Sequence, residues 1–396
     1  MKHFTAHGVG LVVVGAVATA FVFGPAAAWA LGVSPRAIEN RALSPAPAAS
    51  DGWDALDSLA PWATDHLPGR AEAVHLNGWV DFNVLGQLPA SEQVGTKGSA
   101  SAPKVVRGKD GYLFYGRDFT TACDGMTRYE HSLKSVAELA EIIRSSGRRV
   151  VFSIAPNKSS VTTNELPGAM PRGACAARSI ERQNQLLDSM QDPLYVGIRR
   201  ALAEAHASGK QVYLRTDTHW TKLGGAMYAQ AVAMHLDPEM AGRLRLKPEQ
   251  ITTVGDLTRL IGLTSPELVT SVSLSSGGTV FPNPTAATTD VVQANPRPES
   301  WVTRPGDGLI QGRTLLLGDS FTNAALGSLR PLFADGRFVS LGRFPERLIV
   351  GEIESSDTVV IEVVQRDVVG HLFTQPAFHK LVAARLGVPD VRPDVG

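Results

Sequence analysis

Leu315-Leu-Leu-Gly-Asp-Ser-Phe321 reads as a buried strand that stops at a turn of small residues and gives way to a helix-like run. Such a strand ends at the carboxyl edge of a sheet, so the Ser320 hydroxyl is expected at that edge. The amides at the start of the helix lie beside it, and such amides can stabilise an oxyanion. The stretch therefore predicts a serine nucleophile on an α/β sheet, with an ordinary helix cap at Asp319-Ser320 as the alternative.

A candidate base for this serine lies in Asp217-Thr-His-Trp220, between a strand-like run at residues 211–215 and a helix-like run at residues 226–236. An acid and a histidine two residues apart can hydrogen-bond to each other. The carboxylate then holds Nδ1–H and leaves Nε2 free to act as a base. Spacing alone leaves open that His219 is a structural or surface residue.

Strand-like and helix-like runs alternate along most of the chain. Strands are expected at residues 149–155, 212–214, 314–317, 338–341 and 358–364, and helices at residues 133–145, 180–190, 193–207, 226–236 and 323–333. This alternation argues for a mostly parallel sheet covered by helices on both faces. Functional sites gather at the carboxyl ends of strands in such sheets, where Asn157, His219 and Ser320 are all predicted to lie.

The remaining parts of the chain follow other patterns. Residues 105–114 predict a hairpin with its turn at residues 109–111. Residues 53–90 predict short amphipathic helices, and residues 90–102 predict a polar loop. Residues 240–300 are rich in Thr, Ser, Pro and Asn and predict an insertion with weak periodicity.

The N-terminal region contains a 26-residue run without a charged side chain, Gly8 to Val33, which is long enough to span a bilayer. Ala28-Trp-Ala30 could instead serve as a signal-peptidase site. We favour an uncleaved anchor because the run exceeds the usual signal h-region, and in both cases the rest of the chain is exported. The predicted organisation is an anchor or signal at residues 1–34, a linker and helical extension at residues 35–102, and a catalytic domain at residues 103–390.

Composition limits the classes of function. Lysine and arginine together number 38, as do aspartate and glutamate, so nothing favours nucleic-acid binding. No phosphate-cradling glycine-rich loop predicts a nucleotide cofactor, and no Cys/His cluster predicts a metal. The two cysteines, Cys123 and Cys175, are expected to form a disulfide because the exported compartment is oxidising, with two unrelated buried thiols as the alternative.

Several segments together resemble the AlgX/AlgJ family of SGNH-hydrolase-like polysaccharide O-acetyltransferases. They occur in the family's order, from residue 36 to residue 370. Two positions depart from the family pattern: Tyr112 stands for a usual tryptophan, and Gln365 stands for a usual glutamate, which puts an ion pair with Arg366 in doubt. The matching segments are Glu39-Asn-Arg-Ala-Leu43, Val105-Val-Arg-Gly-Lys-Asp-Gly-Tyr-Leu-Phe114, Ala155-Pro-Asn-Lys158, Asp217-Thr-His-Trp220, Gly255-Asp-Leu257, Gly318-Asp-Ser-Phe321 and Glu362-Val-Val-Gln-Arg366.

The resemblance implies an SGNH-hydrolase-like three-layer α/β/α fold with an Asp217, His219 and Ser320 triad. It also implies an acetyl group delivered by a membrane-bound partner protein rather than by a soluble cofactor, and a polysaccharide acceptor. An asparagine side chain serves as an oxyanion donor in SGNH-type sites, which makes Asn157 a candidate, with a turn-shaping role as the alternative.

Three more residues complete the predicted set of oxyanion or substrate-binding candidates. Lys158 follows Asn157 and could either serve the site or shape the same turn. Trp220 could stack on a sugar ring or pack in the core. Arg366 is included because it ends the last matching segment.

The predicted function is extracytoplasmic O-acetylation of a cell-surface or secreted polysaccharide, through an acyl-serine intermediate. Two alternatives remain open on the sequence. One is a carbohydrate esterase with the same triad, which passes the acyl group to water. The other is a non-catalytic polysaccharide-assembly or binding protein on the same scaffold.

Overall fold

A computed structural model describes residues 19, 27, 31–33, 43–48, 50, 52–85, 88, 93–94, 102–120, 123, 126–282, 298–304 and 308–389. The predicted anchor at residues 8–33 lies almost entirely outside these residues. The chain divides into two compact units: residues 1–91 with 258–265, and residues 92–257 with 266–396.

The first unit contains the helices expected between residues 53 and 90. They are α2 (Asp54–Asp65) and α3 (Arg70–Asn83), and within this unit His75 Nε2 lies 3.1 Å from Thr264 Oγ1. The side chains of Leu56, Leu59, Leu76 and Trp79 on these helices are exposed. Across the part of the chain that the structure describes, no helix is both long and apolar enough to cross a bilayer.

The second unit is built on a six-stranded sheet with the strand order β5-β12-β10-β11-β9-β8. The first four strands run parallel, and β9 and β8 extend the sheet in antiparallel fashion. The strands are β5 (Arg149–Ala155), β8 (Thr279–Pro282), β9 (Glu299–Arg304), β10 (Ile310–Gly318), β11 (Phe333–Ser340) and β12 (Thr358–Val364). The mostly parallel sheet expected from the sequence is confirmed.

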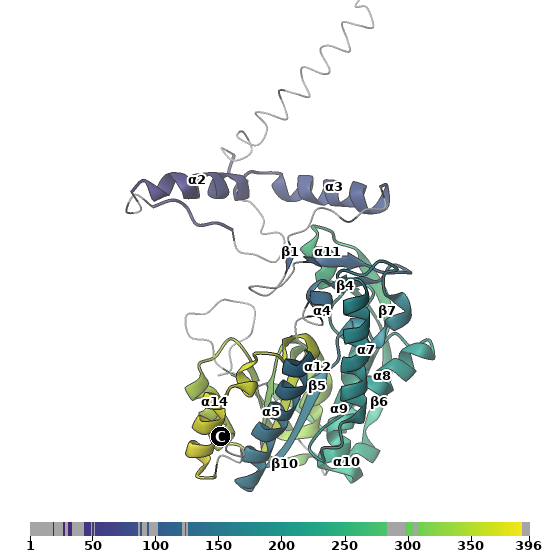
Figure 1. Ribbon diagram of the computed structural model, residues 1–396, viewed down its shortest axis with the longest axis vertical. Coiled ribbons are helices and arrows are strands. Elements are labelled where there is room, and N and C mark those ends of the chain that lie inside the picture. Colours follow the sequence, from purple (N-terminus) through teal and green to yellow (C-terminus); the bar gives the residue numbers. More distant parts are fainter. Residues whose placement is uncertain are drawn as a thin grey trace, which may run out of the picture. The chain divides into compact units, whose positions relative to one another are not determined.

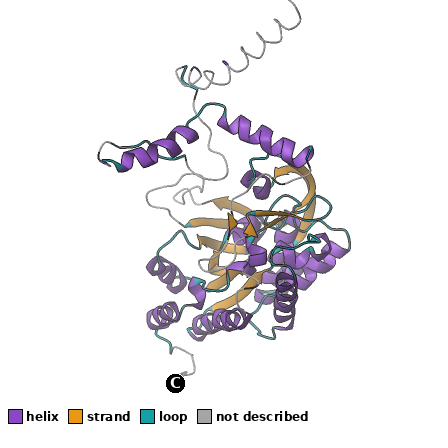
Figure 2. Ribbon diagram, turned by 45° about the horizontal axis from the view of Figure 1, so that its top comes forward, coloured by secondary structure: helices purple, strands orange, loops and turns teal. Residues whose placement is uncertain are grey.

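Helices cover both faces of this sheet (Figures 1 and 2), because the apolar side chains of the central strands alternate between two cores. Leu316 on β10 faces one core, and its neighbours Leu315 and Leu317 face the other. The first core contains side chains of α8 (Arg199–Ala207), α9 (Lys222–Leu236) and α12 (Ser320–Leu329). The second contains side chains of α5 (Met126–Ser145), α13 (Glu346–Glu354) and α14 (Pro376–Leu386).

Smaller elements complete the second unit. The expected hairpin is present as β3 (Val105–Arg107) and β4 (Leu113–Tyr115), and its turn residues Asp110 and Gly111 have positive φ angles. The polar stretch at 90–102 contains the short strand β1 (Gln93–Val94), which pairs with β2 (Ala102–Pro103) at its end. Short helices are α4 (Arg117–Thr120), α6 (Lys158–Val161) and α10 (Pro238–Arg243).

Residues 240–300 are more regular than their sequence indicated. They contain a hairpin of two ten-residue strands, β6 (Arg245–Val254) and β7 (Pro266–Ser275), and then strands β8 and β9 of the main sheet. The helix expected at 193–207 begins only at Arg199. Weak periodicity in the hairpin reflects the exposure of most β6 side chains, which removes the alternation that a buried face imposes.

The strand expected at residues 211–215 is not formed, and this prediction was wrong. The segment makes a single isolated bridge, between Tyr213 and Trp220. Its carbonyl groups are taken by other partners: Thr221 donates to the carbonyl oxygens of Gln211 and Val212, at 2.9 and 2.8 Å. A run this short cannot join the sheet once those backbone groups are occupied.

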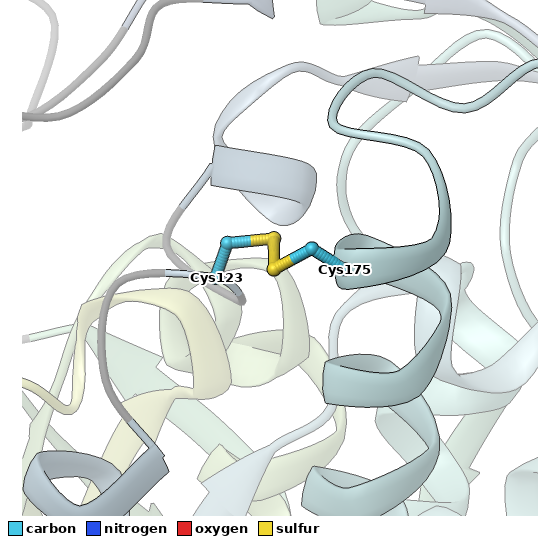
Figure 3. Close-up of a disulfide and its surroundings, with 2 residues drawn as sticks. All are labelled: Cys123 and Cys175. Carbon is cyan, nitrogen blue, oxygen red and sulfur yellow. A yellow bond between two sulfur atoms is a disulfide. The ribbon is translucent and has the colours of Figure 1, made fainter.

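Cys123 and Cys175 form the expected disulfide (Figure 3), with 5.8 Å between their Cα atoms. Cys123 lies between α4 and α5. Cys175 lies in the first turn of α7 (Ala174–Ser189) rather than in a loop. The bridge ties the segment after the β3–β4 hairpin to the start of this helix.

Replacing both cysteines by serine is expected to destabilise the second unit. The bridge closes a loop of 52 residues, which in the chain-entropy model is worth about 4 kcal/mol. Denaturant unfolding of the Cys123→Ser/Cys175→Ser protein should therefore show a lower midpoint than the oxidised wild type. Wild-type protein kept in reductant is the matched control and should unfold like the variant; equal midpoints for oxidised and reduced wild type would contradict the prediction.

Candidate active site

The turn that carries Ser320 is fixed by the side chain before it. Asp319 caps α12: its Oδ1 accepts the Phe321 N–H at 2.8 Å, and its Oδ2 accepts the Val364 N–H at 2.8 Å. The helix-cap alternative is thus correct for Asp319, and it coexists with an exposed Ser320 at the first position of the helix. The cap therefore presents Ser320 at the carboxyl end of β10, where the sequence placed it.

Glu362 on β12 stabilises the same turn by accepting hydrogen bonds from it. Its Oε2 accepts hydrogen bonds from the Asp319 N–H at 3.2 Å, the Thr322 N–H at 3.1 Å and the Thr322 hydroxyl at 2.8 Å. Gly318 is required here, because a Cβ at this position would lie 2.0 Å from Thr322 Oγ1 and 2.9 Å from Glu362 Oε2. In this turn Gly318 avoids a steric clash, Asp319 caps the helix, and Ser320 is left exposed.

Asp217 and His219 form the predicted acid–histidine pair. The His219 Nδ1 lies 2.8 Å from Asp217 Oδ1, which also accepts the His219 backbone N–H at 2.8 Å. Burial opposes the ionisation of Asp217, but the hydrogen bonds and charge of His219 outweigh it and lower the pKa of Asp217. The carboxylate therefore holds the proton on Nδ1 and leaves Nε2 as the basic nitrogen.

The two motifs meet at Phe321, the residue after the serine. The Trp220 indole N–H donates to the Phe321 carbonyl at 3.1 Å, and the rings of His219 and Phe321 lie 5.0 Å apart. The Nε2 atom of His219 is enclosed and has no hydrogen-bond partner within the described residues. These contacts place the histidine beside the turn that carries Ser320, and no hydrogen bond joins His219 Nε2 to Ser320 in the described part of the chain.

Helices α9 and α12, which follow the two motifs, pack closely at a pair of small residues. A Cβ on Gly225 would lie 3.1 Å from the Ala325 Cα and 3.3 Å from its Cβ. Such distances are shorter than ordinary van der Waals contact, so this position tolerates no larger side chain without a shift. Gly225 thus allows α9 and α12 to approach as closely as they do.

Trp220 packs in the core, the second of the two roles that the sequence left open, and its burial leaves no ring face for a sugar. Its side chain is 3% exposed, and its ring stacks on Tyr228 with 5.1 Å between the ring centroids. The indole N–H is already bonded to Phe321. Its contribution is to join the histidine motif to the serine motif.

The Lys158 side chain is buried against the turn that carries Asp217 and His219, so its ammonium group is not accessible to a substrate. Its Nζ donates to the carbonyl oxygens of Leu113, Arg215 and Asp217, at 2.7, 2.7 and 3.0 Å. Burial lowers the pKa of Lys158 to about 7, and the charges of Asp217 and Asp256 are the largest effects that oppose that shift. The three carbonyl acceptors match the three N–H groups of an ammonium. Lys158 therefore joins the β3–β4 hairpin to the turn that carries Asp217.

Asp256 is a site residue for which the sequence suggested no role. Its backbone N–H donates to Asp217 Oδ2 at 2.9 Å, and its own Oδ1 accepts the Thr218 N–H at 2.7 Å. Its Oδ2 lies 3.7 Å from His219 Nδ1, and burial followed by the charge of Asp217 raises the pKa of Asp256. Gly255 permits this approach, because a Cβ there would lie 1.9 Å from the Thr216 carbonyl oxygen. The segment Gly255-Asp-Leu257 was the signal that could have identified it.

Asn157 lies at the carboxyl end of β5, as predicted, and its side-chain oxygen faces Arg366. The backbone N–H and the Nη1 of Arg366 approach Asn157 Oδ1 at 3.3 and 3.4 Å. Because both partners are donors, they identify the amide atom that they contact as the oxygen. The Nδ2 group, for which no described residue is an acceptor, is left as a donor.

Arg366 is buried beside the nucleophile turn, where its guanidinium carbon lies 5.3 Å from the centre of the Phe321 ring. Its Nη1 lies 3.6 Å from Asp118, a carboxylate whose pKa burial raises to about 6 even though Arg366 favours its charged form. Glutamine at position 365 cannot form an ion pair with Arg366, and Arg366 pairs with Asp118 instead. Gln365 instead accepts the Asn157 backbone N–H at 3.0 Å.

Asp217, His219 and Asp256 are the one group among the described residues that could hold a metal ion by its spacing. Their potential ligand atoms all lie within 4.8 Å of one another. The oxygens of Asp217 already accept three N–H groups. A metal ion would have to displace the hydrogen bond that orients His219. The arrangement is therefore better suited to proton transfer than to metal binding.

Comparison with known proteins connects this site to a family. Residues 105–300 match the family model described as "SGNH hydrolase-like domain, acetyltransferase AlgX", a range that includes Asn157, Asp217 and His219 but ends before Ser320. The chain is 29% identical over 141 residues to "Probable alginate O-acetylase AlgJ" of Pseudomonas putida, and 26% identical over 171 residues to the protein of that name from Pseudomonas syringae pv. tomato. These alignments cover 33% and 41% of this chain, and the chain spans only about a third to two fifths of the length of these relatives, 33% and 42%.

Two solved structures are similar in fold. The O-acetyltransferase domain of Pseudomonas putida AlgJ has a TM-score of 0.46 at 20% identity, covering 72% of this chain and 99% of that domain. Bacillus cereus PatB1 with a sulfonyl adduct has a TM-score of 0.49 at 13% identity, covering 68% of this chain and 98% of that protein.

Proposed function

We propose that the protein is a polysaccharide O-acetyltransferase of the AlgX/AlgJ family with Ser320 as its nucleophile, from the premise that residues 105–300 match the model of the AlgX-type, SGNH hydrolase-like domain. The observation that carries the proposal is the Asp217–His219 pair, packed against the residue that follows Ser320. The relatives are named for alginate O-acetylation, which makes a uronate polysaccharide the first acceptor to test.

The proposed reaction has two displacements. His219 Nε2 takes the proton of the Ser320 hydroxyl, the serine oxygen bonds to the acetyl carbon, and the donor's leaving group departs with the proton from His219. A glycan hydroxyl then gives its proton to His219 and attacks the acetyl carbon. The bond to Ser320 breaks, the serine regains its proton, and the acetyl ester remains on the glycan. Asp217 keeps the imidazole oriented and stabilises its charged form throughout.

The oxyanion formed in each step is proposed to bind to the Asn157 Nδ2 group and to the backbone amide of Ser320, because the amides of Asp319, Phe321 and Thr322 already donate to carboxylates. Support comes from Arg366, which occupies the Asn157 oxygen and leaves its nitrogen free to donate. Such donors act on the transition state rather than on the bound substrate. Arg366 is thereby assigned a positioning role, and Lys158 is not assigned to the oxyanion site.

Asn157→Ala is expected to lower kcat by about 10²- to 10³-fold with little change in KM, because one oxyanion donor is lost. The measurement is steady-state acetyl-ester cleavage by the purified protein. Asn184→Ala is the matched control, since Asn184 lies on α7 and donates to a backbone carbonyl instead. An unchanged kcat in Asn157→Ala would remove Asn157 from the oxyanion site.

We also propose that the catalytic unit lies outside the cytoplasm, tethered by residues 8–33. The uncharged run and the disulfide both support this location, because structural disulfides persist in oxidising compartments. Protease added to intact spheroplasts is expected to digest the unit. Full protection would contradict export, and a mature chain starting near Leu31 would replace the tether with a cleaved signal. The acetyl donor is proposed to be delivered by a membrane-bound acyl-transferring protein.

The proposed function is tested by incubating the purified protein with p-nitrophenyl acetate and alginate oligosaccharides, followed by mass spectrometry of the sugars. Acetylated oligosaccharide that disappears in Ser320→Ala would support the transferase. Release of free acetate alone would favour an esterase, which the exposed position of Ser320 also permits. Equal background rates for wild type and Ser320→Ala would favour a non-catalytic assembly protein.

A further inference from the structure

Glu362 is a fully buried acid directly beneath the nucleophile turn. Its Oε2 gathers three donors, from the backbone of Asp319 and from the backbone and hydroxyl of Thr322. Its Oε1 is enclosed and has no hydrogen-bond partner, and no lysine or arginine forms an ion pair with it, within the described residues. An ionised carboxylate buried in this way would lack a compensating charge.

The neighbouring carboxyl group is that of Asp319, whose backbone N–H donates to Glu362 Oε2. Each oxygen of the Asp319 carboxyl group accepts one backbone N–H, from Phe321 and from Val364, whereas all three donors to Glu362 reach a single oxygen. Burial, and next the charge of Asp319, disfavour a charge on Glu362. A proton on Glu362 therefore belongs on the oxygen that accepts no donor.

We propose that Glu362 is a positioning residue for Ser320 that works as a neutral acid. Its carbonyl oxygen receives the three donors of the turn, and its proton removes the negative charge that would otherwise lie beside Asp319. The three hydrogen bonds hold Asp319 and Thr322, on either side of Ser320, so they fix the position of the serine. The inference rests on the proposed role of Ser320 as the nucleophile.

This state should be sensitive to alkaline pH. Burial, followed by the charge of Asp319, raises the pKa of Glu362 well above its usual range. The other titratable groups that interact with Glu362 are Tyr213 and Tyr228, whose own pKa values burial raises well above normal, so both stay neutral. Loss of the Glu362 proton would place a buried negative charge beside the carboxyl group of Asp319 and displace the turn. Acylation of Ser320 should therefore decline as the pH rises.

The test measures the rate of Ser320 modification by phenylmethylsulfonyl fluoride from neutral to alkaline pH, using intact-protein mass spectrometry. Ser320→Ala supplies the background. Glu362→Gln keeps an acceptor and a donor in the same shape, so we expect a rate within about threefold of wild type near neutral pH. Because glutamine cannot ionise, the alkaline decline should be absent from this variant. Glu362→Ala leaves the turn unsupported and should react about 10²-fold more slowly.

Glu354→Gln is the matched control, because Glu354 pairs with Arg385 on the surface, and it should retain the wild-type profile. Melting temperatures at each pH separate loss of the turn from loss of the fold. A Glu362→Gln profile identical to that of wild type, or a Glu362→Ala rate equal to that of wild type, would overturn the inference alone. Wild-type protein that is not modified at Ser320 at any pH would instead overturn the proposed function on which it rests.

Discussion

Ser320→Ala and His219→Ala should each reduce acetyl transfer by on the order of 10⁴- to 10⁶-fold, and the double variant should be no slower than either. The reason is that the serine attacks only when His219 accepts its proton, so removing one residue makes the other useless. Asp217→Asn should be milder than Ser320→Ala, since the imidazole and the nucleophile remain. The measurement is the initial rate of p-nitrophenyl acetate cleavage by the wild type and by each of these four variants.

Two substitutions outside the site serve as controls for these variants. His235→Ala removes an exposed histidine from the same helix that follows His219, and Ser355→Ala removes an exposed serine at the end of α13. Both proteins should keep wild-type rates. If the losses of Ser320→Ala and His219→Ala multiplied in the double variant, the two residues would be acting independently and the triad assignment would be wrong.

Lys158→Met should lower the free energy of unfolding by about 2–4 kcal/mol, because three carbonyl groups lose a buried charged donor. The methionine fills a similar volume, so the loss of hydrogen bonds rather than a cavity causes the effect. One of those carbonyls belongs to Asp217, and its release should also displace the His219 turn. A displacement of about 1 Å can reduce kcat by about 10²-fold. Urea unfolding and esterase rates, measured at a temperature where the variant is folded, report the two effects.

Lys222→Met is the matched control for Lys158→Met. The Lys222 ammonium pairs with Glu249 at 2.8 Å on the surface, where its side chain is 52% exposed. Exposed pairs of this kind contribute about 0–1 kcal/mol, so stability and rate should hardly change. A Lys158→Met protein as stable and as active as Lys222→Met would show that the three carbonyl contacts have no structural role.

The parallel strands and the serine turn could be predicted because their signals are local. Residues 149–155 and 358–364 are mostly apolar, with Ser153 and Glu362 as polar interruptions, and both are strands with those limits. The Asp217–His219 contact also follows from a spacing of two residues on one turn. In these cases a short segment carries all the information that its structure requires.

The supports of the site could not be predicted in this way, because they depend on contacts between distant segments. Nothing near Lys158 indicates that its ammonium would bind carbonyls of residues 113, 215 and 217. The sequence could not decide whether Trp220 stacks on a sugar or packs in the core, because that depends on how deeply the fold buries its side chain. The wrong strand at 211–215 has the same origin, since hydrogen bonds from Thr221 occupy its backbone.

The close contact between Gly225 and Ala325 has a consequence for how the catalytic distance is set. Each helix starts within a few residues of a catalytic side chain: α9 begins three residues after His219, and α12 begins at Ser320 itself. A larger residue at position 225 would translate one helix as a rigid body and would carry its catalytic group with it. The separation of base and nucleophile is thus encoded at a glycine that takes no part in the chemistry, and substitutions there would retune the reaction without altering any reacting group.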